Sequence, residues 1–212
     1  MELPDVDVLV GGATAAHRRL WVTVDGLTDD AVRQPSLLPG WTVGHVLTHI
    51  ARNADSHVRL LEGALAGEQR TQYPGGSEQR ARDIEAGSDR AAAELVVDVH
   101  QTGERLEATW AAMTAQAWSG GGLFDDGSLW PAPLIVFHRW REVEVHHADL
   151  GLGYNPSDWP ADYVAIELPR QLATLPDRLD LVRQRRLTAW LLGREPHPPP
   201  GPPDTGPAVF RA

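Results

Sequence analysis

Apolar residues recur at helical spacing in the first third of the chain. Residues 6–24 predict one helix, and residues 43 to about 67 predict a second, longer helix. Thr42 precedes the second helix and is suited to cap its N-terminus, because a threonine hydroxyl can accept a hydrogen bond from a free backbone amide. The stripe that should face the core in the second helix consists of Val43, Leu47, Ile50, Ala54 and Leu61.

Two more long helices are expected further along the chain. The third spans residues 89 to about 115 with Ser88 as its cap, and the fourth spans residues 130 to about 151 with a proline in its first turn. The glycine-rich segment between them, residues 118–128, lacks the G-K-[ST] ending of a phosphate-binding loop, so we interpret it as a connection. Four long amphipathic helices indicate a mainly α protein, and a four-helix bundle is the arrangement we expect.

The C-terminal part of the chain is shorter and less regular. A further helix is expected at residues 161 to about 175, and residues 183–193 are compatible with a strand followed by a short helix. Prolines crowd the end of the chain, a composition typical of a linker or an extended segment. We therefore expect two parts: a bundle at residues 1–155, and a small α/β or irregular segment with a proline-rich tail at residues 156–212.

Polar residues form a neighbouring stripe on the second helix. Its members follow one another at intervals of three or four residues and are His45, His49, Asn53 and Ser56. In a bundle, such a stripe beside an apolar one can line an internal pocket, while the alternative is a solvent-exposed polar face. We expect the exposed alternative for His57 and Arg59, and an inward position for His49, which lies closer to the apolar edge.

The fourth helix carries the pattern that most suggests chemistry. Glu142 and His146 lie four residues apart and Asp149 follows three residues later, so all three share one helix face. A carboxylate and an imidazole one turn apart can hold a divalent metal, and the aspartate could orient the imidazole. The alternative is a solvated face with one i,i+4 contact, since short motifs also arise by chance. A third ligand would have to come from elsewhere, and the best candidate lies in residues 40–49.

Composition limits the classes of function. The chain has 212 residues, of which 42% are hydrophobic and 23% are charged, so it can form an ordinary core. A formal net charge of −10 argues against nucleic acid and anionic membrane surfaces as partners. No apolar run is long enough to span a membrane, and the N-terminus lacks the basic region of a secretory signal, so we expect a cytoplasmic protein.

Cysteine and lysine are both missing from the sequence. Without cysteine, any metal must be held by histidine, aspartate or glutamate, and thiol chemistry would need a thiol from outside the protein. Without lysine, Schiff-base catalysis by a lysine side chain is excluded. The available chemistry therefore centres on histidine, carboxylates and arginine.

Three segments resemble one family of helical-bundle proteins. They are LPGWTVGHVLTHIARNADS at residues 38–56, HRWREVEVHHADLGLGY at residues 138–154 and AWLLGR at residues 189–194. These segments resemble the DinB/YfiT-like metal-dependent bundle superfamily and, more narrowly, the mycothiol-dependent maleylpyruvate isomerases. The resemblance covers most of residues 1–194 and implies a DinB-like four-helix bundle.

The resemblance also implies which residues hold a metal. The family's three zinc ligands fall on His49, Glu142 and His146, and we predict these three as the metal-binding and catalytic residues. His147 and Glu144 are the alternatives by register, but neither lies on the face shared by Glu142 and His146. Three protein ligands leave one position open on zinc or another divalent ion, as in catalytic sites.

A reaction follows from the same resemblance. Mycothiol would bind at the metal as a thiolate, add to the cis double bond of maleylpyruvate, and leave after bond rotation to give fumarylpyruvate. A dicarboxylate or other electrophilic substrate needs cationic partners, and Arg80, Arg82 and Arg194 are candidates, of which we assign Arg82 and Arg194 to cofactor binding. The alternatives are a mycothiol S-transferase, a metal-dependent hydrolase, or a non-catalytic binding or regulatory module. Monomer and homodimer both remain open.

Overall fold

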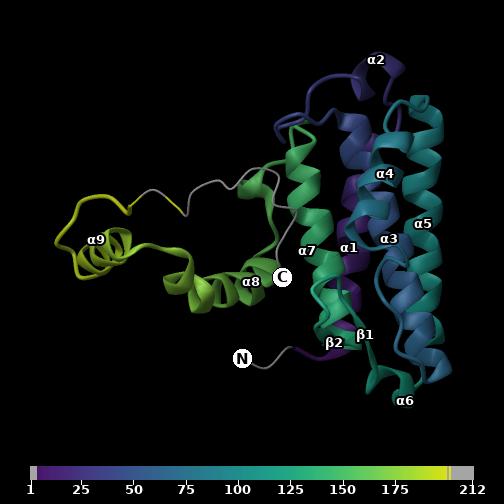
Figure 1. Ribbon diagram of the computed structural model, residues 1–212. Coiled ribbons are helices and arrows are strands. Elements are labelled where there is room, and N and C mark those ends of the chain that lie inside the picture. Colours follow the sequence, from purple (N-terminus) through teal and green to yellow (C-terminus); the bar gives the residue numbers. More distant parts are fainter. Residues whose placement is uncertain (1–3, 200, 202–212) are drawn as a thin grey trace. The chain divides into compact units, whose positions relative to one another are not determined.

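The computed structural model describes residues 4–199 and 201 (Figure 1). Contacts divide the chain into two compact units, one reaching to Trp159 and the other starting at Pro160. Both units are built almost entirely from helices, which confirms the predicted mainly α fold. Among the described residues, no helix has the length and apolar character needed to cross a membrane.

Four long helices form the first unit, and they lie side by side in Figure 1. Helix α3 packs against α5 and α7, and α1 packs against α7 and α5. Their bounds are α1 Val6–Val24, α3 Val43–Ala66, α5 Ala92–Ala112 and α7 Ala132–Asp149. The predicted four-helix bundle is therefore confirmed. Shorter helical elements connect or follow these helices: α2 Asp29–Val32, α4 Gly76–Gly87, α6 Ala115–Trp118 and the 3-10 turn Pro156–Asp158.

Apolar side chains from all four long helices fill the interior of the bundle. Leu20, Leu47, Leu106 and Trp140 are fully buried. Burying a leucine side chain stabilises a fold by about 1.5–3 kcal/mol. Helices α1 and α7 approach closely at Gly12, where an added Cβ would lie 2.3 Å from the ring of Trp140. A side chain at this position would push the two helices apart.

Helix α3 has the ends that its sequence predicts. The Thr42 hydroxyl accepts a hydrogen bond from the His45 amide (3.3 Å), and His45 Nδ1 accepts one from the Thr42 amide (3.2 Å). At the other end, Gly67 has a φ of 71°, the left-handed conformation that favours glycine. The reciprocal cap fixes the start of the helix one turn before His49.

The start of the third long helix was predicted wrongly. Ser88 does not cap it: this residue follows the end of α4, and its hydroxyl donates to the Glu85 carbonyl (2.9 Å). Helix α5 instead begins at Ala92, where the Glu94 carboxylate accepts a hydrogen bond from the preceding backbone amide (3.2 Å). Because α4 continues as far as Gly87, the backbone around Ser88 belongs to the end of one helix rather than to the start of the next.

The glycine-rich connection contains a small β-hairpin that its sequence pattern did not indicate. Strands β1 Gly121–Leu123 and β2 Leu129–Pro131 pair antiparallel, with Gly122 opposite Trp130. A Cβ on Gly122 would lie 2.5 Å from Cδ2 of Leu60, so glycine permits the hairpin to pack directly on α3. The segment is a connection in sequence, but it also covers part of the bundle.

The second unit consists of two helices joined by a 3-10 turn. Their bounds are α8 Ala161–Thr174, the turn Pro176–Arg178 and α9 Leu181–Leu191. The helix at α8 was predicted, but the strand expected within residues 183–193 is wrong. Asp180 caps α9 by accepting a hydrogen bond from the Arg183 amide (2.8 Å), so the chain is helical from there. Most of the predicted proline-rich tail lies outside the described residues.

Candidate metal centre

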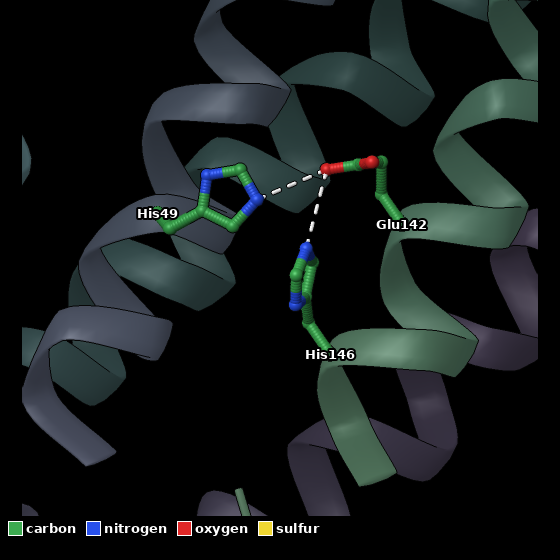
Figure 2. Close-up of side chains that lie close together, drawn as sticks. All are labelled: His49, Glu142 and His146. Atoms are coloured by element: carbon green, nitrogen blue, oxygen red, sulfur yellow. Dashed lines mark hydrogen bonds and ion pairs between the residues drawn. The ribbon is translucent and has the colours of Figure 1, made fainter. Parts of the chain in front are cut away.

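Three side chains from two facing helices converge in the bundle (Figure 2). His49 comes from α3, and Glu142 and His146 come from α7. Their potential ligand atoms all lie within 4.8 Å of one another, and all three residues are buried. His49 Nε2 lies 3.0 Å from Glu142 Oε2, and His146 Nε2 lies 3.7 Å from the same oxygen. Within the described part of the chain, this is the one cluster of histidine and acidic residues with such spacing.

Helical geometry explains why these residues meet. Glu142 and His146 are one turn apart on α7, and α3 packs against that helix. The rings of His49 and His146 are perpendicular, with centroids 4.5 Å apart, so their Nε2 atoms approach one carboxylate oxygen from different directions. The arrangement places two imidazole nitrogens and one carboxylate oxygen around a common point, and these residues could hold a metal ion there.

Asp149 orients His146, as predicted. Its Oδ2 lies 2.8 Å from His146 Nδ1, one turn along α7. A carboxylate can only accept, so Nδ1 carries the hydrogen and donates it. In the uncharged form of this ring the lone pair is on Nε2, which is the nitrogen that faces Glu142.

The arginine that contacts the cluster is Arg80 rather than Arg82. Arg80 is buried, and its Nη2 donates to His49 Nδ1 (3.1 Å). Arg82 lies two residues later on α4 and therefore on nearly the opposite face; its side chain is 68% exposed and lies 3.7 Å from Glu78. Arg82 therefore does not contact the cluster, and its assignment to cofactor binding stays a prediction. Arg194 is exposed in the second unit, and its assignment stays a prediction.

Burial and neighbouring charges determine the net charges of His49 and Glu142. Burial lowers the pKa of His49 to about 3, reinforced by the charge of His146 and opposed by Glu142. Burial alone would raise the pKa of Glu142, but three neighbouring histidines outweigh it and hold that pKa well below its ordinary value. At neutral pH the site therefore holds a neutral His49 and an ionised Glu142.

A second pair of buried histidines lies behind the carboxylate. His138 Nε2 is 3.6 Å from Glu142 Oε1, and His138 Nδ1 is 3.1 Å from His57 Nε2. The exposed position expected for His57 is wrong, because this residue is fully buried. Burial lowers the pKa of His138 to about 4 and that of His57 well below its usual range. The sequence did carry a signal for His138, since it precedes Glu142 by one helical turn.

The register alternatives face away from the cluster. Glu144 accepts hydrogen bonds from Trp140 Nε1 (2.9 Å) and from the Tyr154 hydroxyl, and it pairs with Arg19 of α1. His147 Nε2 lies 2.7 Å from the hydroxyl of Thr23, also on α1. Both side chains are therefore engaged in holding α7 against α1 and the segment that follows α7.

Comparisons with known proteins indicate the same family as the sequence motifs. A family model described as "Mycothiol maleylpyruvate isomerase N-terminal domain" matches residues 13–151. A solved mycothiol-dependent maleylpyruvate isomerase is 28% identical with a TM-score of 0.72, and the match covers 77% of this chain and 67% of that chain. A mutant of a mycothiol-dependent maleylpyruvate isomerase is 27% identical, with the same TM-score and coverage.

A third solved structure supports the fold alone. YfiT from Bacillus subtilis, a protein with an unusual four-helix bundle topology, is 18% identical with a TM-score of 0.57; the match covers 71% of this chain and 86% of that one. A comparison with curated proteins found no match. The family model nevertheless spans well over half of the sequence. The chain therefore belongs to the family of the mycothiol maleylpyruvate isomerase N-terminal domain.

Proposed function

We propose that this chain binds a divalent metal ion, with zinc as the first candidate, at His49, Glu142 and His146, and that it acts as a mycothiol-dependent maleylpyruvate isomerase. The family and the isomerase structures support the reaction. The convergence of three buried ligand atoms supports the metal. This convergence is the observation on which the proposal depends most.

The set of ligand atoms fits zinc. Two imidazole nitrogens and one carboxylate oxygen are a combination that catalytic zinc sites use. Ligands at about 2.0–2.2 Å from zinc and at tetrahedral angles lie about 3.4 Å from one another. The separations of 3.0 and 3.7 Å between Glu142 Oε2 and the two histidine nitrogens lie on either side of this value. Small side-chain rotations would be enough for coordination.

Each residue has a role in this proposal. Glu142 provides a carboxylate and His49 a neutral imidazole, because the pKa values of both lie below neutral pH. Asp149 keeps the lone pair of His146 directed at the same point. A bound metal would lower the pKa of a thiol and so supply a thiolate for addition to the cis double bond of the substrate. Since the chain has no cysteine, that thiol must come from outside, and mycothiol is the candidate.

The proposal is tested with the purified protein. Metal content is measured by mass spectrometry, and isomerisation of maleylpyruvate is followed with and without mycothiol. We expect stoichiometric zinc and turnover only when mycothiol is present. Hydrolysis of a mycothiol conjugate without isomerisation would favour a metal-dependent hydrolase, and a chain without metal or turnover would favour a non-catalytic module.

A further inference from the structure

Arg80 is a buried cation, and the part of the chain that the structure describes gives it no carboxylate partner. Its side chain comes from α4, and the residue is only 8% exposed. Among the described residues, no carboxylate lies within ion-pair distance of it, although Arg82 on the same helix has Glu78. Burial raises the pKa of Asp125, and the charge of Arg80 opposes this rise. The two side chains form no ion pair in the described part of the chain. Burying a guanidinium without an anion is costly, so this position suits an anionic ligand.

The hydrogen bond between Arg80 and His49 determines which ring nitrogen carries the proton. A guanidinium can only donate, so Nδ1 must accept, and the neutral ring then carries its hydrogen on Nε2. That hydrogen is directed at Glu142 Oε2, 3.0 Å away. A metal bound at Nε2 needs the reverse, a lone pair on Nε2 and a hydrogen on Nδ1. Ligation through Nε2 and the hydrogen bond from Arg80 therefore exclude each other.

The two histidines of the cluster therefore differ in their tautomers, that is, in which ring nitrogen carries the hydrogen. His146 Nδ1 faces an acceptor, the carboxylate of Asp149, and so the ring already has the tautomer that ligation requires. His49 Nδ1 faces a donor, and so its ring has the opposite tautomer. Removing this difference requires Arg80 to move away from Nδ1, the hydrogen on Nε2 to leave to solvent, and a hydrogen from solvent to bind at Nδ1.

We propose that Arg80 exchanges partners. It donates to His49 in the arrangement seen here, and it binds a carboxylate of the substrate when His49 Nε2 is a metal ligand. This inference rests on the proposed function, from which it takes the metal and a dicarboxylate substrate. Once Nδ1 carries a hydrogen it no longer accepts, and the released guanidinium can bind a carboxylate through two parallel hydrogen bonds. Because coupling between two binding events is reciprocal, the carboxylate should in turn strengthen metal binding.

Three variants test the exchange: Arg80→Met, which removes the charge and all donors, Arg80→Lys, which keeps the charge, and Arg82→Met as the matched control on the exposed face of α4. Zinc affinity is measured by competition with a chromophoric chelator. Binding of maleate to the zinc-loaded protein is measured by calorimetry without thiol, with maleamide as the uncharged probe.

We expect Arg80→Met to bind maleate about 10–100-fold more weakly than the wild type, the size of a lost charge-assisted hydrogen bond, and maleamide unchanged. Its zinc affinity should rise by about 2–10-fold, because a competing hydrogen bond and a nearby cation are both removed. The maleate and zinc affinities of Arg80→Lys should lie between those of the wild type and of Arg80→Met. This variant still tests the proposal if Arg80→Met fails to fold. Arg82→Met should match the wild type.

The outcomes separate this inference from the proposed function. If zinc binds and Arg80→Met leaves the maleate affinity unchanged, the exchange is wrong while the metal centre stands. A loss of zinc affinity in Arg80→Met, like that expected for an orienting residue, also overturns it. A wild-type chain that takes up no zinc contradicts both. Nitrogen NMR provides an independent check: without zinc the hydrogen of His49 should be on Nε2, and an Nδ1 hydrogen there would overturn the exchange.

Discussion

Two buried histidine centres, one around His17 and one around His49, lie in the same bundle, and they differ in the hydrogen-bond partners of their polar atoms. Around His17, donors and acceptors alternate: Arg139 Nε donates to Nε2 (3.0 Å), and Nδ1 lies 2.8 Å from Glu107 Oε1. The ring also stacks against Trp21 and Trp110, with both centroid distances at 5.8 Å. The arrangement connects α1, α5 and α7 through fixed partners.

The cluster around His49 has the opposite character. Three atoms that can each offer a lone pair, two imidazole nitrogens and one carboxylate oxygen, face one another. Burial lowers the pKa of His17 and of His49 alike, to about 4 and about 3, so neither burial nor a shifted pKa distinguishes the two. The distinguishing property is how the polar atoms are arranged: each ring nitrogen of His17 has a partner of its own, whereas three potential ligand atoms of the His49 cluster share one point, where a cation could replace the hydrogen that His49 Nε2 directs at Glu142.

The largest expected effect follows from removing one of the three potential metal ligands. His49→Ala should remove bound zinc and reduce mycothiol-dependent turnover by more than the roughly 10–100-fold typical of residues that only orient a ligand. The fold should persist, because the bundle is stabilised mainly by its apolar core. Zinc content, circular dichroism and turnover are measured on the same sample. An unfolded variant would mean that the metal is structural, and a folded, zinc-free variant that is still active would refute a catalytic metal.

The reverse pattern is expected at the other centre. His17→Leu removes the acceptor of the buried Arg139 Nε and one of the two partners of Glu107, which keeps Arg18, so the free energy of unfolding should fall by about 2–4 kcal/mol. Zinc bound per folded chain should not change. Urea denaturation and metal analysis check the two halves of this prediction. Loss of zinc without loss of stability would show that the two centres are not separate in function.

A smaller effect is expected from Asp149, which orients His146 without facing the common point. Asp149→Ala should weaken zinc binding by about 10–100-fold while leaving the stoichiometry intact. Glu104→Ala, at an exposed carboxylate on α5, is the matched control and should leave the affinity unchanged. Chelator competition measures both. Equal zinc affinities for the two variants would show that Asp149 does not support metal binding and only occupies the end of α7.

The sequence predicts one of these centres better than the other. The periodicity of α7 is enough to place Glu142, His146 and Asp149 on one face, because the spacing within a helix is fixed. Choosing His49 as the partner on α3 needed the family resemblance, since periodicity cannot say which side of a polar stripe meets another helix. The same limit led to an exposed position for His57, which is fully buried.

The choice between arginines shows a second limit. Arg80 and Arg82 lie two residues apart on α4, so they point in nearly opposite directions. Which of them reaches His49 depends on the rotation of a short helix about its axis. That rotation is set by packing against α3, and the sequence of α4 alone does not specify it. Sequence patterns are therefore reliable within one long helix, and less so between helices.

The smallest expected effect concerns pH. Burial lowers the pKa of His17 to about 4, whereas an unfolded chain has a histidine pKa of about 6.5. Between these values the unfolded state binds more protons than the folded state, so stability rises with pH and is lost as pH falls. His17 alone should cost about 1 kcal/mol of unfolding free energy between about pH 6.5 and pH 5.5.

His17→Leu should accordingly lose less stability than the wild type over this pH range, by about the same 1 kcal/mol. The dependence should not vanish, because His57 and His138 are buried with lowered pKa values as well. Leu106→Ala is the control: it should destabilise the core by about 2–5 kcal/mol yet keep the full pH dependence, since it removes no titrating group. Urea denaturation at three pH values decides the matter. If His17→Leu and Leu106→Ala have the same pH dependence, His17 is not the neutral, fully partnered histidine that its contacts indicate, and the contrast with the His49 cluster fails.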